Sequence, residues 1–217
     1  MDAGHKHVEN VDSAPPAAAP ADPSRGIAAL LELVPGRLAA LADVTAAGHV
    51  ASDLDTVHRA LRRIRDEQLA RGPVFCEWGS GLGAAASMAA LLGFDAHGIE
   101  IDDELVGAAR QLAHDCDARA SFAVGTFLRT EDQALMADSA YDHPAPDTDA
   151  WGDLGLAPDG CDIVFTYPWP GEERLLDRLF VAQTTPGALL LTFHGDSLLL
   201  VQRHVAGSDV LEPLGWM

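Results

Sequence analysis

The chain has 217 residues, long enough for one domain with a substantial buried core and some appended segments. Its formal net charge is −19, from 33 acidic against 14 basic residues. This balance argues against a general nucleic-acid binder and against binding to anionic membranes, because both need clustered Lys and Arg. A partner that is a small molecule is the better expectation.

Cysteine spacing and hydropathy bear on metal binding, membrane insertion and cellular compartment. The three cysteines, Cys76, Cys116 and Cys161, lack metal-site spacing, so no metal is expected and reduced thiols are predicted. No apolar stretch approaches the length of a membrane span, and the first residues lack the apolar core of a signal peptide. The expected compartment is therefore the cytoplasm. The sequence predicts no particular oligomeric state.

The first third of the chain divides into a tail and helices. Residues 1–24 are rich in Ala, Pro and Asp, which predicts a disordered tail. Residues 25–72 should form N-terminal helices, of which the second is capped by Ser52 with Asp55 three residues on. The second helix carries the one concentrated basic feature, which we interpret as a solvated face paired with nearby acids. Its members are Arg59, Arg62, Arg63 and Arg65.

The most informative stretch runs from Val74 to Gly83, with the sequence VFCEWGSGLG. A short apolar run contains the acid Glu77, glycines follow at alternate positions, and an alanine-rich segment comes next. This order predicts a buried strand, a tight turn and a helix. Glycine permits backbone conformations closed to other residues and leaves room for a ligand. The stretch therefore predicts the first half of a nucleotide-binding βαβ unit, with a strand, turn and helix that bind nothing as the plainer alternative.

Two kinds of nucleotide fit this turn. Gly79, Gly81 and Ala84 match the dinucleotide fingerprint GxGxx(G/A), in which a pyrophosphate lies at the helix N-terminus. A carboxylate at Glu77 would repel a pyrophosphate, whereas it could accept hydrogen bonds from the ammonium group of an amino-acid moiety. The helix N-terminus could then bind the carboxylate of the same ligand.

The next strand, residues 96–101, contains a second acid near its end. Glu100 lies 21 residues beyond Gly79 (100 − 79), about the distance at which nucleotide folds place a carboxylate on ribose hydroxyls. A carboxylate can accept from both of two vicinal hydroxyls. The alternative is a solvent-exposed acid at a strand end. A third strand is predicted over residues 120–124, followed by Thr126.

Residues 130–160 change the character of the chain. They hold eight acidic residues and no Lys or Arg, together with three prolines. We expect an irregular connection, most simply a solvated loop; a lid whose charge suits a cationic acceptor is the alternative.

The last third alternates strands with a helix. Strands are predicted over residues 162–167, 188–193 and 197–205, with a helix after Glu172 in the first gap. Strands that alternate with helices indicate a parallel sheet covered on both faces, and ligands bind such sheets outside the carboxyl ends of the strands. The glycine turn and the residues after each strand should therefore share one rim.

Three segments together, EWGSGLG at 77–83, GIEI at 98–101 and DIVFTYPWP at 162–170, resemble the class I S-adenosylmethionine (SAM)-dependent methyltransferases. The resemblance covers about residues 74–193 and implies a Rossmann-like, doubly wound, mostly parallel α/β sheet within a SAM-binding domain at 73–217. Glu100 would bind the ribose and Ile101 would lie against the adenine. The cofactor-binding residues that it implies are Glu77, Gly79, Ser80, Gly81, Gly83, Glu100, Ile101, Thr126 and Phe127.

The chain departs from this family at three places. Gly125 and Thr126 stand where many relatives have an acid for the adenine amino group, so that contact would come from Thr126 or the backbone. The segment Thr166-Tyr167-Pro168-Trp169 replaces (Asp/Asn)-Pro-Pro-(Tyr/Phe), so N-methylation is not implied. Finally, three residues between the last two strands are too few for a crossover helix, and we expect an antiparallel hairpin in a shortened C-terminal part.

The leading hypothesis is a SAM-dependent methyltransferase with a small-molecule acceptor, a cation being one candidate. Tyr167 and Trp169 are predicted to wall the acceptor side of the methyl group, where aromatic faces favour positive charge. His194 is a candidate base, or else a satisfied structural histidine. The alternatives are an NAD(P)-dependent oxidoreductase and a non-catalytic SAM- or nucleotide-binding protein.

Overall fold

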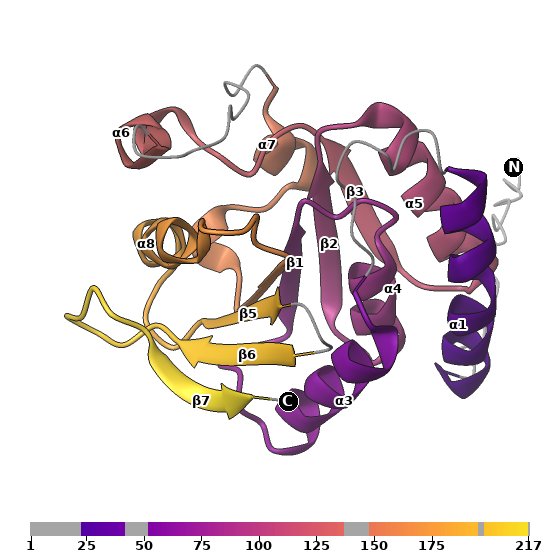
Figure 1. Ribbon diagram of the computed structural model, residues 1–217, viewed down its shortest axis with the longest axis horizontal. Helices are drawn as coiled ribbons and strands as arrows, with labels where there is room; N and C mark the ends of the chain where they lie inside the picture. The colour runs from indigo at the N-terminus through magenta and orange to yellow at the C-terminus, as the bar shows by residue number, and fades with distance from the viewer. Residues whose placement is uncertain (1–22, 42–51, 137–147, 195–197, 217) are drawn as a thin grey trace, which may run out of the picture.

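The computed structural model describes residues 23–41, 52–136, 148–194 and 198–216 (Figure 1). Its strands form one sheet in the order β3-β2-β1-β4-β5-β6-β7. The first five run parallel, β6 is antiparallel to β5, and β7 is antiparallel to β6. The bounds are β1 Val74–Trp78, β2 Asp95–Glu100, β3 Ala120–Val124, β4 Ile163–Thr166, β5 Leu189–His194, β6 Leu198–Arg203 and β7 Glu212–Trp216. The predicted Rossmann-like, mostly parallel sheet is confirmed.

Helices cover both faces of the sheet (Figure 1). The helices are α1 Pro23–Ala40, α3 Leu54–Asp66, α4 Ala84–Leu91, α5 Asp103–Asp115, α6 Gln133–Met136, α7 Ala150–Leu154 and α8 Glu173–Gln183, with short 3-10 turns at η1 Thr130–Asp132 and η2 Pro158–Gly160. Among these described elements, none is both long and apolar enough to cross a membrane.

Alternation along the strands divides the core into two layers. In β1, Phe75 packs with the layer formed by α1, α3, α4 and α5, whereas its neighbour Cys76 packs with the layer of α7 and α8. Ile163 and Val164 of β4 divide in the same way. Successive strand residues point to opposite faces, so fully apolar strands are what a sheet covered on both sides requires.

The chain reverses its direction across the sheet between β1 and β4. It runs outward from β1 through β2 to β3, then returns to place β4 on the other side of β1. Such a switch point opens a crevice at the carboxyl ends of the strands. The register places Trp78 of β1 beside Ile99 and Thr166, so the glycine turn begins at this crevice.

The hairpin predicted for the last two strands is confirmed. β5 and β6 pair antiparallel, from Leu189 opposite Arg203 to His194 opposite Leu198. β7, which the sequence did not predict, adds an outer strand, with a register shift between Val201 and Gln202 of β6.

The N-terminal helices differ in detail from expectation. Pro23 and Ser24 begin α1; the rest of the predicted tail lies outside the described residues. The N-cap of α3 is Asp53, whose carboxylate accepts from the Asp55 amide, so the predicted cap at Ser52 is wrong by one residue. The helix also ends at Asp66 rather than near residue 72.

The arginines of α3 are paired locally, as interpreted from the sequence. Arg63 binds Glu67 at 3.1 Å, and Arg65 binds Asp66 at 2.7 Å. All four side chains are exposed, and such pairs contribute little to stability. They offset the positive charge of Arg63 and Arg65 on this helix.

In its described parts, residues 130–136 and 148–160, the acidic segment is not the irregular loop that its composition suggested. Its described parts contain η1, α6, α7 and η2, and Trp151 of α7 is buried in the core layer that holds α8. Apolar side chains between the acids are responsible, because they give α7 a face that packs on β3. Residues 137–147 lie outside the described residues.

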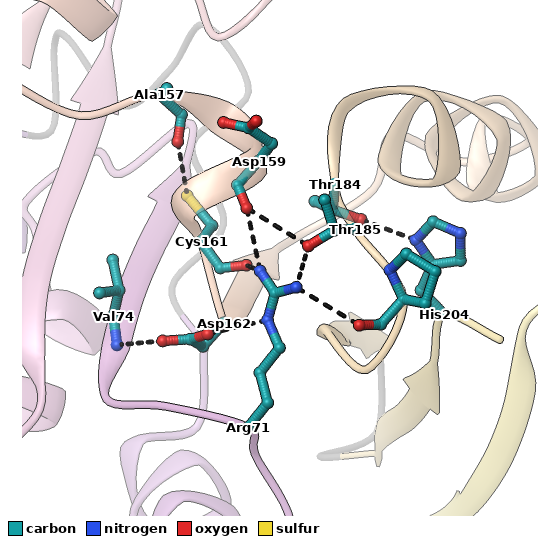
Figure 2. Close-up of polar contacts among 10 residues, drawn as sticks. Arg71, Val74, Ala157, Asp159, Cys161, Asp162, Thr184, Thr185 and His204 are labelled. Carbon is teal, nitrogen blue, oxygen red and sulfur yellow. Dashed lines mark hydrogen bonds and ion pairs between the residues drawn. The ribbon is translucent and has the colours of Figure 1, made fainter. Parts of the chain in front are cut away.

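At the edge opposite the carboxyl ends, Arg71 joins three connections (Figure 2). Its guanidinium donates to Asp162 at 2.9 Å, to the carbonyls of Asp159 and Cys161 at 2.9 and 3.0 Å, and to the Thr185 hydroxyl. Asp162 in turn accepts from the Val74 amide at 3.0 Å. One side chain thus links the segments that lead into β1, β4 and β5.

Candidate functional site

The five parallel strands bring the predicted site residues to one edge of the sheet. Glu77 lies in β1, Glu100 ends β2, Thr126 follows β3, Tyr167 follows β4, and His194 ends β5. The first three lie around the switch point, and the last two lie on the β4–β5 side of it.

The glycine turn has the backbone conformation that its composition predicts. Gly79, Gly81 and Gly83 have φ angles of 71°, 52° and 65°, in the left-handed region that favours glycine. A Cβ at Gly83 would also collide with the ring of Phe122, whereas a Cβ at Gly79 would meet nothing within 4 Å. The turn therefore packs tightly on its inner side and leaves open space beside Gly79.

Backbone hydrogen bonds fix the turn to β2. The amides of Gly79 and Ser80 both donate to the Ile99 carbonyl, at 3.0 and 2.9 Å. Ser80 itself is buried, and its hydroxyl oxygen has no hydrogen-bond partner among the described residues. The turn is thus held in place before any ligand arrives.

The Glu100 carboxylate lies directly against the turn. It accepts from the Gly81 amide at 2.8 Å, from the Ile101 amide at 2.7 Å and from the Asp102 amide at 3.1 Å. A carboxylate has about four acceptor positions, so these three amides leave capacity for a ligand hydroxyl. Ile101, next to it, is 52% exposed and is therefore accessible to a ligand.

Glu77 is buried in β1, two residues before Gly79. Its carboxylate accepts from the Ala86 amide in the first turn of α4, at 2.9 Å. Burial raises the pKa of Glu77, the Ala86 hydrogen bond lowers it and the nearby Glu100 carboxylate raises it, and together these effects bring it to about 8. A cationic group beside Glu77 would relieve this cost of ionisation, whereas a phosphate there would add to it.

The loop after β3 contains contacts that the sequence did not reveal. The Thr126 hydroxyl accepts from the Leu128 amide at 3.1 Å. The Phe127 ring stacks on Trp78, with centroids 4.9 Å apart and planes 3° apart. Phe127 is thus fixed beside the glycine turn by its ring. No spacing rule would have paired these two aromatic residues, because they lie 49 positions apart (127 − 78).

The three predicted acceptor-side residues have different surroundings. Tyr167 is half-buried and packs against Phe193, with centroids 5.4 Å apart. Trp169 is 45% exposed. The Nε2 atom of His194 lies 3.0 Å from the Thr192 hydroxyl.

Two acids of α8, Glu173 and Asp177, interact electrostatically on this side of the rim, and Asp177 also interacts with His194. Burial and the neighbouring Glu173 raise the pKa of Asp177, which faces the opposing influence of His194. Among the described residues, no group of three or more His, Cys, Asp or Glu side chains could hold a metal ion.

An open groove of about 550 Å³ lies beside the loop after β3, lined by residues that include Thr126, Arg129 and Trp151. Neither Glu77 nor any glycine of the turn lines it. The convergence of buried carboxylates and strand ends, rather than this groove, defines the candidate site.

No protein-family model and no curated protein matches the chain. Among solved structures, an RNA methyltransferase from Salinibacter ruber in complex with S-adenosyl-L-homocysteine is 22% identical, with a TM-score of 0.44, over 66% of this chain and 76% of that one. A SAM-dependent methyltransferase from Thiobacillus denitrificans, also with S-adenosyl-L-homocysteine, is 16% identical, with a TM-score of 0.44, over 70% and 54%. A magnesium protoporphyrin IX methyltransferase from Synechocystis is 18% identical, with a TM-score of 0.41, over 64% and 53%. The chain spans about half the length of the last two.

Proposed function

We propose that the protein is a SAM-dependent methyltransferase that acts on a small molecule. One observation carries the proposal: at the switch point of the sheet two buried carboxyl groups accept from backbone amides, Glu100 from Gly81 in the glycine turn and Glu77 from Ala86 at the start of α4. SAM offers a partner to each of them, an ammonium group at one end and ribose hydroxyls in the middle.

In this proposal, Glu77 binds the ammonium group and Glu100 binds the ribose. Glu77 occupies the Ala86 amide at the start of α4, and no side chain caps that helix. The remaining amides there can bind the ligand's carboxylate, because a helix N-terminus favours negative charge. In the same proposal, Ile101 and Thr126 contact the adenine.

The same geometry disfavours a dinucleotide. A pyrophosphate at the start of α4 would compete with the Glu77 carboxyl for the Ala86 amide, and its negative charge would oppose ionisation of Glu77 further. An NAD(P)-dependent oxidoreductase is therefore the weaker hypothesis.

Methyl transfer is a displacement at carbon in line with the departing sulfur. The protein's contribution is then mainly to hold acceptor, methyl and sulfur in line. We propose that Tyr167 and Trp169 flank the methyl group, whose partial positive charge suits aromatic faces. His194 can accept a proton from the acceptor, with its Nε2 hydrogen bond to Thr192 limiting its orientation.

We propose that the acceptor is a small molecule and that it carries positive charge, since the net charge of −19 and the acids near β5 favour a cation. Nucleic acid and membranes are not expected as partners. The three buried free thiols fit a reducing compartment, and we place the protein in the cytoplasm.

A second candidate, a SAM-binding protein without catalysis, is favoured by one observation. Tyr167 packs against Phe193, which belongs to the core, and this packing alone can account for an aromatic residue after β4. A pool of small-molecule acceptors with radiolabelled methyl-SAM separates the two candidates, because only an enzyme transfers the label.

Calorimetry with SAM, S-adenosylhomocysteine, NAD and NADP tests the cofactor assignment. We expect binding of the first two and silence from the dinucleotides. Tight binding of either dinucleotide, with no heat from SAM or S-adenosylhomocysteine, would end the methyltransferase proposal.

A further inference from the structure

The loop that follows β3, residues 125–129, is anchored to other parts of the chain at both ends. The Gly125 amide donates to the backbone carbonyl of Glu100 at 2.8 Å. At the other end, the Arg129 amide donates to the Asp132 carboxylate at 2.7 Å. The loop therefore lies in a defined conformation beside the carboxylate that we assign to the ribose.

The carbonyl of Phe127, in the middle of this loop, accepts two donors. Nε1 of Trp151, in α7, lies 3.1 Å away, and Nε2 of Gln183, at the end of α8, also lies 3.1 Å away. Gln183 donates to the Asp132 carboxylate as well, at 2.7 Å. The Gln183 amide thus holds the loop directly, at the Phe127 carbonyl, and indirectly, through the Asp132 carboxylate that binds the Arg129 amide.

Burial makes these hydrogen bonds costly to lose. Gln183 and Asp132 are each 2% exposed, and Trp151 is 7% exposed. The buried side chains of Gln183, Asp132 and Trp151 have little access to water, so a lost partner costs free energy and the loop would shift to limit that cost. The donors come from positions 24 and 56 residues away in the sequence, which ties the loop to two separate elements.

The ring of Phe127 connects the same loop to the residue that precedes the glycine turn. It stacks on Trp78, which directly precedes Gly79 and is 1% exposed. The Thr166 hydroxyl, from β4, donates to the Trp78 carbonyl at 3.2 Å. A displaced loop would therefore disturb the side of the site that receives a nucleoside.

We propose that Gln183 and Trp151 are positioning residues for the adenosine half of the SAM site and that they act through the Phe127 carbonyl. The inference rests on the proposed function. A loop that is ordered before binding spares the ligand the entropy of ordering it, so its anchors contribute to affinity without touching the ligand. The acidic segment, through Trp151, is then part of the cofactor site.

Ligands that share only the adenosine half provide the test. We would measure the affinities of S-adenosylhomocysteine and of 5′-methylthioadenosine, which lacks the amino-acid part, for Gln183→Met and Trp151→Phe. Each variant removes a donor to the Phe127 carbonyl, Gln183→Met with a side chain of similar length and Trp151→Phe with an aromatic ring; Gln183→Met also removes the donor to Asp132. We expect both ligands to bind about tenfold more weakly, by the same factor. Glu77→Gln should weaken S-adenosylhomocysteine alone.

Thr184→Val is the matched control. Thr184 is the next residue along the chain and is also buried, but its hydroxyl donates to the Phe180 carbonyl at 2.7 Å and lies 3.2 Å from Nδ1 of His204 (Figure 2). This variant should lower the melting temperature and leave both affinities within twofold.

Three results would overturn the inference. The first is unchanged affinity, within twofold, in Gln183→Met and Trp151→Phe. The second is a loss confined to S-adenosylhomocysteine. The third is an equal loss in Thr184→Val. If Gln183→Met fails to fold, Trp151→Phe decides alone. Wild-type protein that binds neither ligand would instead remove the proposed function, and this inference with it.

Discussion

Binding of S-adenosylhomocysteine should release a proton from Glu77. In the free protein, burial raises the pKa of this carboxyl to about 8, so roughly nine-tenths of the molecules carry it protonated at pH 7. The ligand's ammonium group pairs with the ionised form of Glu77, so the carboxyl must lose its proton when the ligand binds. The affinity for S-adenosylhomocysteine should therefore rise with pH up to about 8, because a smaller fraction of the protein has a proton on Glu77 to lose.

The magnitude follows from the same pKa. If only the ionised form binds, affinity should rise about 25-fold between pH 6 and pH 7.5, with about 0.9 proton released per ligand near pH 7. Calorimetry in two buffers of different ionisation enthalpy measures both quantities. The stability of the free protein should change with pH in the opposite direction. The raised pKa of Glu77 stabilises the folded state fully below pH 4.5, and this contribution is lost as pH rises through about 8.

Two controls isolate Glu77. Glu77→Gln should bind S-adenosylhomocysteine more weakly and with no dependence on pH in this range. The ligand 5′-methylthioadenosine, which has no ammonium group, should bind the wild-type protein equally at pH 6 and pH 7.5. A flat affinity for S-adenosylhomocysteine, with no proton released, would refute the pairing of Glu77 with the ammonium group.

Three further substitutions test other parts of the structure. Glu100→Ala should weaken S-adenosylhomocysteine about tenfold to a hundredfold, the loss of roughly 1.5–3 kcal/mol in hydrogen bonds to ribose, and wild-type affinity by calorimetry would show the ribose to be misplaced. Arg71→Lys should lower the free energy of unfolding by about 2–4 kcal/mol in urea, because Lys cannot reproduce the planar set of donors, and should leave ligand affinity unchanged; a loss of affinity would mean that the far edge communicates with the site. Tyr167→Ala should keep SAM affinity within a few-fold and abolish methyl transfer, which a turnover assay with an identified acceptor would check; full activity would exclude Tyr167 from the acceptor site.

The fold was predictable because its signals are local. Apolar runs of strand length alternate with helical patterns, which predicts a parallel sheet covered on both faces. Residues 194–196 are too few for a crossover helix, which predicted the antiparallel pairing of β5 and β6. The glycines of the turn predicted left-handed backbone, since few other residues adopt it.

What the sequence could not show depends on distant partners. Asp132 was one acid among eight in a segment that composition marks as solvated, yet Gln183 and Arg129 hold it inside the protein. Trp151 gave no sign that it would support the loop after β3. Such contacts join residues dozens of positions apart, and no periodicity encodes them. The prediction of the α3 N-cap was wrong for a different reason. Ser52 and Asp53 are both good N-cap residues, and sequence reasoning locates a helix end only to within a residue or two.

A crystal structure of the complex with S-adenosylhomocysteine tests the cofactor assignment most directly. We predict that the ribose hydroxyls lie at hydrogen-bond distance, roughly 3 Å, from the Glu100 carboxylate, and that the amino group faces Glu77 across the glycine turn. A ligand seated elsewhere, or in the reverse direction with its base beside Glu77, would contradict the assignment of both carboxylates.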